Sequence, residues 1–549
     1  MVPLFKKHLF LIGIVLTSLL PFIPFFISSD LLHTHDGLVH LPRLAAYFKA
    51  LLDGNFPVRI AGYLNYDYGL PLFNFIYQTP YLVGSLFLLI GFSLVNAFKV
   101  SLLLSFVFSG IFAYLFGKEY FSDEKKGFLF AILYQFVPFR MVELLVRGSY
   151  GEVYTYTFLP LVLYGLALIQ NKKIFKGILI TAIAQALLIL SHNSVSLLFA
   201  GASFLFLLVT SSGFRTRTVG IIGLAIGTLI AAFYWLPALM EHKYTYGNLY
   251  MENLYKDHFV PIQNFFIPNL TNSSSFQTEG ITTFLGLIQI VAMVFALKLI
   301  LSKKLDKREK RIFIAGFILM IVSFFFMLPI SSFIWSSEYS SFLRQFQFPW
   351  RFLSLTVVAC AFFAVSLISV NKKIKKNFYL LSIAGLSILS ILYFFKTDLG
   401  YKKINQDYYW NFPLNTTYYG ETDVIWSAGP AKEYPKSTIE IISGKGEVSN
   451  FVKKNHFQTF TMRSLDRVGV VSHTQYFPGW KAYVNGSEVP IQFQDANHRG
   501  LLVFDIPKGE NKILVKFEEN KLRVLSDIAS VLGILLLVPI ALFSKRYLK

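Results

Sequence analysis

Residues 9–27 read LFLIGIVLTSLLPFIPFFI, and the chain continues over residues 28–40 as SSDLLHTHDGLVH. The first run has no charged residue and, at about 1.5 Å per residue, is long enough to cross the roughly 30 Å hydrocarbon core of a bilayer as a helix. No small-residue cleavage site follows it, so we expect an uncleaved membrane span rather than a signal peptide. The chain therefore begins with a helix that brings a dense group of titratable residues to one membrane face.

The composition of the whole chain agrees with this start. Of its 549 residues, 54% are hydrophobic and 15% are charged, which is typical of a polytopic membrane protein rather than of a soluble domain. The formal net charge of +20 comes from short Lys and Arg clusters between apolar runs, which argues against a nucleic-acid-binding surface. Cys360 is the only cysteine, which excludes an intramolecular disulfide and a cysteine-based zinc cluster.

Twelve apolar runs are long enough to be transmembrane helices. They cover residues 9–27, 96–116, 127–146, 154–170, 174–190, 195–210, 219–238, 281–301, 311–328, 351–370, 377–395 and 524–543. A further run, Tyr81–Phe92, follows the helix breaker Pro80 and is too short to span comfortably. We expect this run to be re-entrant or interfacial.

The basic clusters orient these spans. If residues 81–92 do not cross, all the clusters fall on one face, as the positive-inside rule requires of the cytoplasm. The clusters are Lys6–Lys7, Lys118 with Lys125–Lys126, Lys172–Lys176, Arg215–Arg217, Lys303–Arg311, Lys372–Lys376 and Lys545–Lys549. If residues 81–92 do cross, every cluster after the first moves to the opposite face. We therefore predict a multi-pass protein of the plasma (inner) membrane with both termini in the cytoplasm.

This topology leaves external segments at 28–95, 240–280 and 329–350 within a transmembrane domain of residues 1–395. In a fourth external segment, 396–523, apolar residues alternate, and Asn485-Gly486 is typical of a tight hairpin turn. We predict a small antiparallel β-sandwich there, followed by a last membrane helix and a basic cytoplasmic tail over 524–549. The expected fold class is a polytopic α-helical membrane protein with a small extracytoplasmic β-sandwich near its C-terminus.

Asp36 is the first candidate functional residue. A carboxylate directly after a membrane exit can deprotonate an acceptor hydroxyl or bind a divalent cation. Asp is also a preferred N-cap, and Asp36 precedes the interfacial helix expected over Gly37–Leu52, so a structural role is equally compatible with the sequence. His35 and His40 are candidate metal ligands, although their spacing matches no strong zinc pattern.

Other ionisable residues lie at the outer ends of the predicted spans. Arg140, Glu143 and Arg147 share one helical face at spacings of three and four. They form either a structural ion-pair ladder or a site in which Arg147 binds phosphate and the following Glu152 supplies a second carboxylate. His192 ends the fifth span and is either an interfacial residue or part of the same site.

Arg344 and Arg351 lie near the entry to the tenth span, where they either anchor the helix at the interface or bind a lipid phosphate. Asp67 lies among aromatic and turn residues, a composition suited to sugar stacking or to the membrane interface. P-loop, GxSxG and HExxH motifs are absent from the sequence, which argues against an ATPase, a serine hydrolase and a zinc protease.

Several short motifs give the chain a family likeness. They are His35–Gly37 with Pro42–Arg43, Gly54–Pro57, Gly69–Phe73, Gln347–Phe352, Tyr476–Trp480 and Val484–Gly486, and they extend over nearly the whole chain. In these motifs the chain resembles the bacterial YfhO-like and 6-pyruvoyl-tetrahydropterin-synthase-related membrane proteins, which are similar to the GT-C glycosyltransferase superfamily. The pterin in that name implies no pterin chemistry for this chain.

The resemblance implies an inverting transfer of a sugar from a polyprenyl-phosphate donor to a hydroxyl of a cell-envelope glycan, lipid or protein. Asp36 matches the acidic position of the first external loop and would be the base, while Glu152, or Glu143, would be the second acidic residue. Gly37 follows Asp36 where the superfamily has a paired acidic residue, so the sequence leaves metal dependence open. The candidate cofactor is a divalent cation, Mg²⁺ or Mn²⁺, and Asp36 would be its ligand. The donor phosphate would contact Arg351, Arg147 and Arg344, and the substrates would contact His35, His40, Arg43, Asp67 and His192.

Two other classes of function are compatible with the sequence. A lipid-linked glycan flippase or other transporter needs charged residues near the bilayer midplane, and most ionisable residues of this chain lie at helix ends instead. A non-catalytic envelope assembly protein could use Trp480 and Tyr483 of the external domain to stack on glycan, although aromatic residues of a sandwich are more often part of its core.

Overall fold

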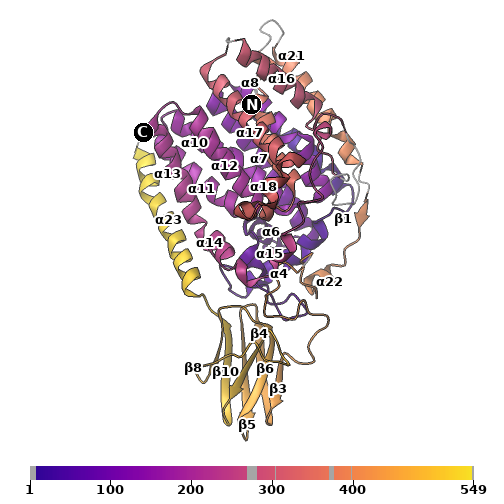
Figure 1. The fold of residues 1–549 in the computed structure, drawn as a ribbon, viewed down its shortest axis with the longest axis vertical. Helices are drawn as coiled ribbons and strands as arrows, with labels where there is room; N and C mark the ends of the chain where they lie inside the picture. The colour runs from indigo at the N-terminus through magenta and orange to yellow at the C-terminus, as the bar shows by residue number, and fades with distance from the viewer. Residues whose placement is uncertain are drawn as a thin grey trace.

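A computed structural model describes residues 8–268, 281–302, 305–369, 376–396, 399–418 and 420–546. Figure 1 shows a long body of helices with a small domain of strands at one end. The described ends of the chain lie toward the opposite end of the helical body (Figure 1).

The helical body combines long helices with short connecting turns. The helices of its first part are α2 (Leu9–Leu19), η1 (Leu20–Phe22), α3 (Ile23–Phe26), α4 (Gly37–Leu52), α5 (Leu72–Phe75), α6 (Thr79–Leu89), α7 (Leu94–Phe121), α8 (Glu124–Gln135), α9 (Pro138–Met141), η2 (Val142–Arg147), α10 (Tyr150–Gln170), α11 (Ile174–Ile189), α12 (Asn193–Thr210), α13 (Phe214–Ile230) and α14 (Ala232–Met240). Those of the second part are η3 (His242–Tyr244), α15 (Gly247–Met251), η4 (Ile262–Phe265), α16 (Leu287–Leu301), α17 (Lys307–Met327), η6 (Pro329–Ser331), α18 (Ser332–Ser336), η7 (Glu338–Phe346), η8 (Pro349–Phe352), α19 (Leu353–Phe363), α20 (Ser366–Ser369), α21 (Lys376–Leu389), η9 (Leu392–Phe395), α22 (Gln406–Trp410) and α23 (Lys521–Arg546).

Each of the twelve predicted spans contains a helix, but not all of these helices are long, and α16 begins six residues into the span predicted over 281–301. Within the described residues, eight helical runs are long and apolar enough to cross a membrane: Leu9–Phe26, Leu94–Phe121, Tyr150–Gln170, Asn193–Thr210, Lys307–Met327, Pro349–Ser369, Asn377–Phe395 and Lys521–Leu542. Two bent pairs, α8 with α9–η2 and α13 with α14, raise the number to ten. The remaining two, α11 and α16, have 16 and 15 residues. The described residues thus hold eight to ten candidate spans by length and composition, and the total of twelve stays a prediction.

A proline explains the helix break that lies next to the site. Helices α8 and α9 are bent by 56° where Pro138 begins α9. Because proline disfavours helical geometry in the residue before it, Val137 is extended, with φ −74° and ψ 135°. The chain then continues as the π-helical turn η2, which ends at Gly148 with a positive φ of 62°. Single π-helical turns are frequent at functional sites.

Helix α6 corresponds to the run Tyr81–Phe92, which the distribution of basic residues predicts not to cross the membrane. It has 11 residues, which is about 16 Å at 1.5 Å per residue, roughly half of the hydrocarbon core. Just before it, the Gln78 amide donates to the carbonyl of Leu190, and just after it the Leu94 amide donates to the side chain of Gln406. The residues that flank α6 on both sides therefore contact segments that the predicted topology places outside.

Three of the basic loops meet one another. Lys126 pairs with Glu309 at 2.8 Å, and Arg308 donates to the side chain of Asn171 at 2.7 Å. Lys173 pairs with Glu119 at 2.8 Å. Three loops that the positive-inside rule assigns to one face are thus in contact with one another.

The strands form a two-sheet antiparallel sandwich, as predicted. One sheet has the order β4-β5-β10-β7-β8 and the other β3-β6-β9. The strands are β3 (Ile439–Ser443), β4 (Gly446–Lys454), β5 (Phe457–Ser464), β6 (Val468–Gln475), β7 (Trp480–Val484), β8 (Ser487–Val489), β9 (Leu501–Ile506) and β10 (Gly509–Phe517). Asn485 and Gly486 turn the chain between β7 and β8 with φ 50° and 84°, as a tight hairpin requires. Trp480 is buried in the core of the sandwich.

Residues 399–438 lie between η9 and the first strand of the sandwich. Their first part, residues 399–418, packs on the helical body, whereas Val424 belongs to the core of the sandwich. Strand β2 (Tyr401–Lys402) pairs with β1 (Leu31–Leu32), and α22 packs against α4. Farther along, Arg43 of α4 donates to Thr416. We call residues 399–418 the strap. The sandwich strands therefore begin at Ile439, and the domain boundary at residue 396 stays a prediction.

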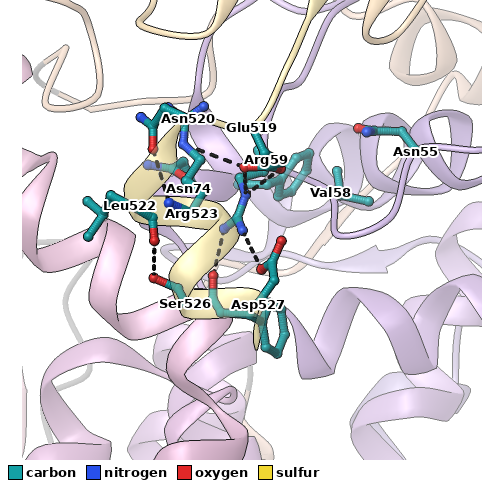
Figure 2. Close-up of polar contacts among 12 residues, drawn as sticks. Asn55, Val58, Arg59, Asn74, Glu519, Asn520, Leu522, Arg523, Ser526 and Asp527 are labelled. Atoms are coloured by element: carbon teal, nitrogen blue, oxygen red, sulfur yellow. Dashed lines mark hydrogen bonds and ion pairs between the residues drawn. The ribbon is translucent and has the colours of Figure 1, made fainter. Parts of the chain in front are cut away.

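A buried ion-pair joint fixes the sandwich and α23 to the helical body (Figure 2). Arg59 of the first external segment donates to Glu519 at 2.9 Å and 3.1 Å and to Asp527 of α23 at 3.0 Å. Arg523 of α23 donates to Glu241 at 3.0 Å, after the end of α14. Both guanidinium groups are almost fully buried. Because an unpaired buried charge is costly, these pairs hold the relative position of the three parts.

Candidate functional site

The backbone sets the position of the first candidate residue. The amides of His35 and Asp36 donate to the carbonyls of Val146 and Arg147 at 3.1 Å and 2.8 Å. These bonds join the segment after the first span to the last residues of η2. Asp36 therefore lies beside Arg147 although 110 residues separate them in sequence.

The side chain of Asp36 does not cap helix α4. Asp36 is at the N-cap position, but its side chain makes no capping hydrogen bond, and the Gly37 amide is instead bonded to the hydroxyl of Thr34 at 3.1 Å. One Asp36 oxygen lies 3.6 Å from Arg147 Nη2, and the other accepts a hydrogen bond from the Tyr418 hydroxyl at 3.0 Å. The capping interpretation is therefore wrong, because the carboxylate faces the ion-pair cluster.

Arg147 is the centre of this cluster. Its Nη1 lies 2.7 Å from Glu143 and 2.9 Å from Glu152, while Nη2 faces Asp36. The guanidinium also lies 4.8 Å from the centre of the Trp350 ring, a cation–π distance. Three carboxylates from three segments thus surround one guanidinium.

Arg351 and His192 complete the cluster on the far side of Glu152. Arg351 Nε lies 3.2 Å from the same Glu152 oxygen that Arg147 contacts, and Arg351 Nη1 donates to the Phe346 carbonyl and to Gln347 Oε1. Arg351 Nη2 has no hydrogen-bond partner among the described residues. His192 Nε2 lies 3.7 Å from Glu152.

His192 is held neutral. Its Nδ1 accepts the Val195 amide at 3.3 Å at the start of α12, so the proton is on Nε2, which faces Glu152. Burial lowers the pKa of His192 to about 3, and the guanidinium groups of Arg351 and Arg147 contribute to the lowering while Glu152 opposes it. Across the physiological range His192 is therefore a neutral donor toward Glu152.

The cluster is nearly closed to solvent. Side-chain exposure is 0% for Glu143 and Glu152, 5% for Arg147, 8% for Arg351 and 15% for Asp36. In Arg147, Glu152 and Trp350, three buried polar atoms have no hydrogen-bond partner among the described residues: Glu152 Oε2, Arg147 Nε and Trp350 Nε1. Asp36 is the most exposed carboxylate of the three, and the strap residue Tyr418 covers it.

Two of the other predicted residues lie next to the cluster without joining it. His40 Nδ1 is bonded to the Tyr81 hydroxyl at 2.9 Å, and its Nε2 accepts the Tyr150 amide at 3.3 Å. Burial, followed by the charge of Arg43, lowers the pKa of His40 well below its usual range. With both ring nitrogens engaged, His40 has no atom left for a metal in this arrangement. Arg43 is bonded to the strap at Thr416.

Of the remaining predicted residues, Arg344 and Asp67 lie elsewhere, and His35 lies beside the cluster. Arg344 donates to Glu252 and to the carbonyls of Trp335 and Ser336. Asp67 pairs with Lys453 of the sandwich at 3.2 Å. His35 is tied through its amide to η2. The structure therefore brings Asp36, Arg147, Glu152, His192 and Arg351 together, and it does not bring Arg344 or Asp67 to them.

Sequence reasoning missed two members of the cluster. Tyr418 reaches Asp36 from 382 residues away, and no motif in the strap marks it. Trp350 stacks on Arg147, and its position beside Arg351 in the Pro349-Trp350-Arg351 run is the available signal. The resemblance offers Glu143 only as an alternative to Glu152, whereas both carboxylates contact Arg147.

The cluster does not fit a divalent cation. Such an ion needs several carboxylate or carbonyl oxygens directed at one point, and no group of three His, Cys, Asp or Glu residues in the described ranges could hold a metal. The three carboxylates that converge in the cluster are directed at the Arg147 guanidinium. The Asp36 metal site expected from the resemblance therefore has no supporting geometry.

Comparison with known proteins gives a family and a distant structural likeness. The family model for the 6-pyruvoyl-tetrahydropterin synthase related domain, described as a membrane protein, matches residues 73–396. Among solved structures, the chain is similar to the oligosaccharyltransferase of Archaeoglobus fulgidus in its apo form, with a TM-score of 0.48, 13% identity, and coverage of 74% of this chain and 57% of that one. The complex of that enzyme with zinc and sulfate gives a TM-score of 0.40, 12% identity, and coverage of 74% and 53%.

The chain therefore spans little more than half the length of these structures. A search among curated proteins gave no match. The family match extends from α5 to the end of η9 and includes Glu143, Arg147, Glu152, His192 and Arg351, while Asp36 precedes it. More than half of the chain fits one family model, and the chain belongs to the family of 6-pyruvoyl-tetrahydropterin synthase related membrane proteins.

Proposed function

We propose that the chain is a membrane glycosyltransferase that moves a sugar from a polyprenyl-phosphate donor to a hydroxyl of a cell-envelope glycan, lipid or protein. The observation that carries the proposal is the buried cluster in which Arg147 contacts Asp36 and Glu152, and Arg351 contacts the same oxygen of Glu152. These residues come from separate segments, and buried ionisable groups at the ends of membrane helices often mark a functional site.

The proposed reaction is a single displacement with inversion. The acceptor hydroxyl gives its proton to a carboxylate oxygen of Asp36 while its oxygen forms a bond to C1 of the donor sugar. The bond between C1 and the phosphate oxygen breaks on the opposite face, and its electron pair leaves with the polyprenyl phosphate. Attack opposite the leaving group inverts the configuration at C1, and no covalent enzyme intermediate forms.

Asp36 is suited to the role of base because it already accepts a hydroxyl hydrogen bond. The Tyr418 O–H donates to Asp36 Oδ1 at 3.0 Å, which is the geometry that a substrate hydroxyl would need. In the proposed cycle the strap moves Tyr418 away, and the acceptor takes its place.

Arg351 is the proposed partner of the leaving phosphate. Its Nη2 has no partner among the described residues, while Glu152, Phe346 and Gln347 fix the rest of the guanidinium. A fixed cation in a dry site stabilises developing negative charge more strongly than one in water. Arg147 is engaged by carboxylates, and we propose that it orients them. For Arg344, which lies apart, we propose a contact with the donor lipid at the membrane interface.

The proposal includes an orientation. The basic loops face the cytoplasm, and the cluster, the strap and the sandwich lie on the extracytoplasmic side of the plasma membrane. The contacts among the basic loops support this arrangement, since cytoplasmic loops carry the excess of Lys and Arg.

Transfer in proteoliposomes supplied with polyprenyl-phosphate sugars and envelope acceptors tests the function. We expect Asp36→Asn to lower kcat by roughly 10²–10⁴-fold, the usual contribution of a general base. Asp466→Asn, at an exposed turn of the sandwich, is the matched control and should leave transfer unchanged. Equal transfer by parent and Asp36→Asn would remove Asp36 as base, and donor translocation without transfer would favour the flippase alternative.

A further inference from the structure

The arrangement around Arg147 resembles the ligand shell of a metal ion with a guanidinium at its centre. Asp36 approaches from the segment after the first span, Glu143 from η2 and Glu152 from the first turn of α10. Their oxygens lie 3.6 Å, 2.7 Å and 2.9 Å from the nitrogens of Arg147. Among the described residues, only Glu152 has a second guanidinium partner, Arg351.

The position of Arg147 is fixed from several directions. Its side chain is buried against the Trp350 ring at 4.8 Å. Its carbonyl accepts the Asp36 amide at 2.8 Å, so the two residues are joined through the backbone as well as by their charges. Gly148 follows in left-handed geometry and ends η2 directly after it. The guanidinium is therefore held in place by the fold rather than by its ion pairs alone.

A guanidinium can perform the orienting task of a cation among carboxylates. It keeps its positive charge at any pH that proteins tolerate and offers five N–H donors in one plane, so several carboxylates can bind it at once. A divalent cation would need the same oxygens at about 2.0–2.6 Å from its own centre. The Arg147 guanidinium and such an ion therefore cannot occupy the middle of the cluster together.

We propose that Arg147 takes the place of a divalent cation in this site, so that the carboxylates are oriented by a permanent internal cation and the reaction needs no metal. This inference rests on the glycosyl transfer proposed above. Arg147 is then a positioning residue: it holds Asp36 toward the acceptor and Glu152 toward Arg351, and it leaves Arg351 to meet the phosphate.

Removing the guanidinium should create a metal site. Arg147→Ala would leave Asp36, Glu143 and Glu152 around an empty volume with no central cation. Carboxylate oxygens in such a group are the ligands that Mn²⁺ and Mg²⁺ prefer. Arg147→Lys keeps one positive charge and should not gain a metal site, which makes it the matched variant.

Binding of Mn²⁺ to the purified full-length chain in nanodiscs, followed by electron paramagnetic resonance and by thermal unfolding, is the direct test. We expect the parent, Arg147→Lys and the surface control Arg463→Ala to show no saturable Mn²⁺ binding and no change in Tm. We expect Arg147→Ala to bind Mn²⁺ and to gain roughly 2–5 °C in Tm at about 100 times its Kd. Arg147→Ser, which also removes the guanidinium and leaves the volume open, replaces Arg147→Ala if the latter yields too little folded protein.

The same preparations separate the two proposals. Saturable Mn²⁺ binding by the parent, or transfer that a chelator abolishes and Mn²⁺ restores, would overturn the role of Arg147 while leaving the glycosyl transfer intact. A folded Arg147→Ala that binds no Mn²⁺ would also overturn it. If no donor supports transfer and only Arg147→Ala gains Mn²⁺ binding, the proposed glycosyl transfer is wrong, whereas the proposal that Arg147 is the internal cation stands.

Discussion

Glu152 shows how one residue can join two parts of a buried cluster. Its Oε1 lies within 3.7 Å of Arg147, Arg351 and His192, whereas its Oε2 is buried without a partner among the described residues. A carboxylate in such surroundings is held by the charges of both guanidinium groups. Its unpartnered oxygen is the acceptor in this cluster that a hydroxyl of the donor sugar could meet.

His192 gives a prediction about pH. Its pKa is about 3 in the folded chain and about 6.5 when unfolded, so the unfolded state binds more protons between these values. Folding stability should therefore fall as pH drops from about 6.5 toward about 3, by up to about 1.4 kcal/mol per pH unit from this residue. We expect His192→Asn, which keeps a capping acceptor for Val195, to flatten the decline of Tm between pH 7 and pH 4.

The control for this measurement is His8→Asn, at an exposed position before α2. It should reproduce the parent profile. An unchanged acid-dependent loss of Tm in His192→Asn would show that other groups cause it.

At the scale of elements, proline and glycine decide where the chain turns. Pro138 breaks α8 from α9, and Gly148 ends η2, so the two residues between them that face the cluster, Glu143 and Arg147, lie on a π-helical turn. The sequence pattern predicts one uninterrupted span over residues 127–146 because the apolar run continues through the break. The pattern of apolar residues predicts a helix but does not predict the bend of 56° within it.

The hairpin between β7 and β8 allows a test at this scale. Gly486 has φ 84°, and a Cβ built there meets no atom within 4 Å. Substitution therefore costs backbone strain only. We expect Gly486→Val to destabilise the sandwich by about 1–2 kcal/mol, because a β-branched residue disfavours left-handed geometry. Gly486→Asn should cost less, since Asn tolerates this region.

Hydrogen exchange of the β7 and β8 amides in the full chain measures the difference between the two variants. Faster exchange in Gly486→Val than in Gly486→Asn is the expected result. Equal exchange rates would mean that the turn does not limit the stability of these strands.

For the whole molecule, the joint at Arg59 decides how the sandwich is held. Glu519 and Asp527 both pair with Arg59, which is itself almost fully buried (Figure 2). We expect Arg59→Ala to destabilise the joint by about 3–5 kcal/mol, because it leaves partly buried carboxylates without their cation. Limited proteolysis should then cut near residues 518–520 faster, while Arg467→Ala, which breaks an exposed pair with Asp505, should leave the rate unchanged.

Apolar contacts between the sandwich and the helical body are the alternative to the ion pairs of the joint. If Arg59→Ala is no more sensitive to protease than Arg467→Ala, the sandwich is held by its apolar contacts instead. Phe75 of the helical body packs on Phe477 in that interface at a ring distance of 5.8 Å, so this alternative has a definite structural basis.

The sequence alone predicted the positions of the apolar helices, the grouping of three basic loops and the sandwich with its hairpin turn. These follow from local properties: the length of apolar runs, the position of charges between them and the alternation of side chains along a strand. The sequence also singled out Asp36, Arg147, Glu152, His192 and Arg351 because ionisable groups beside hydrocarbon are costly.

Only the tertiary structure decided which of these residues lie together. The sequence left open whether Asp36 caps the following helix, because the contact of its carboxylate with Arg147 joins residues that are far apart in the chain. The approach of Tyr418 to Asp36 and the exclusion of Arg344 and Asp67 from the cluster have the same cause. Electrostatic interactions between buried groups depend on distances of a few ångströms, and those distances are set by how the helices and the strap pack.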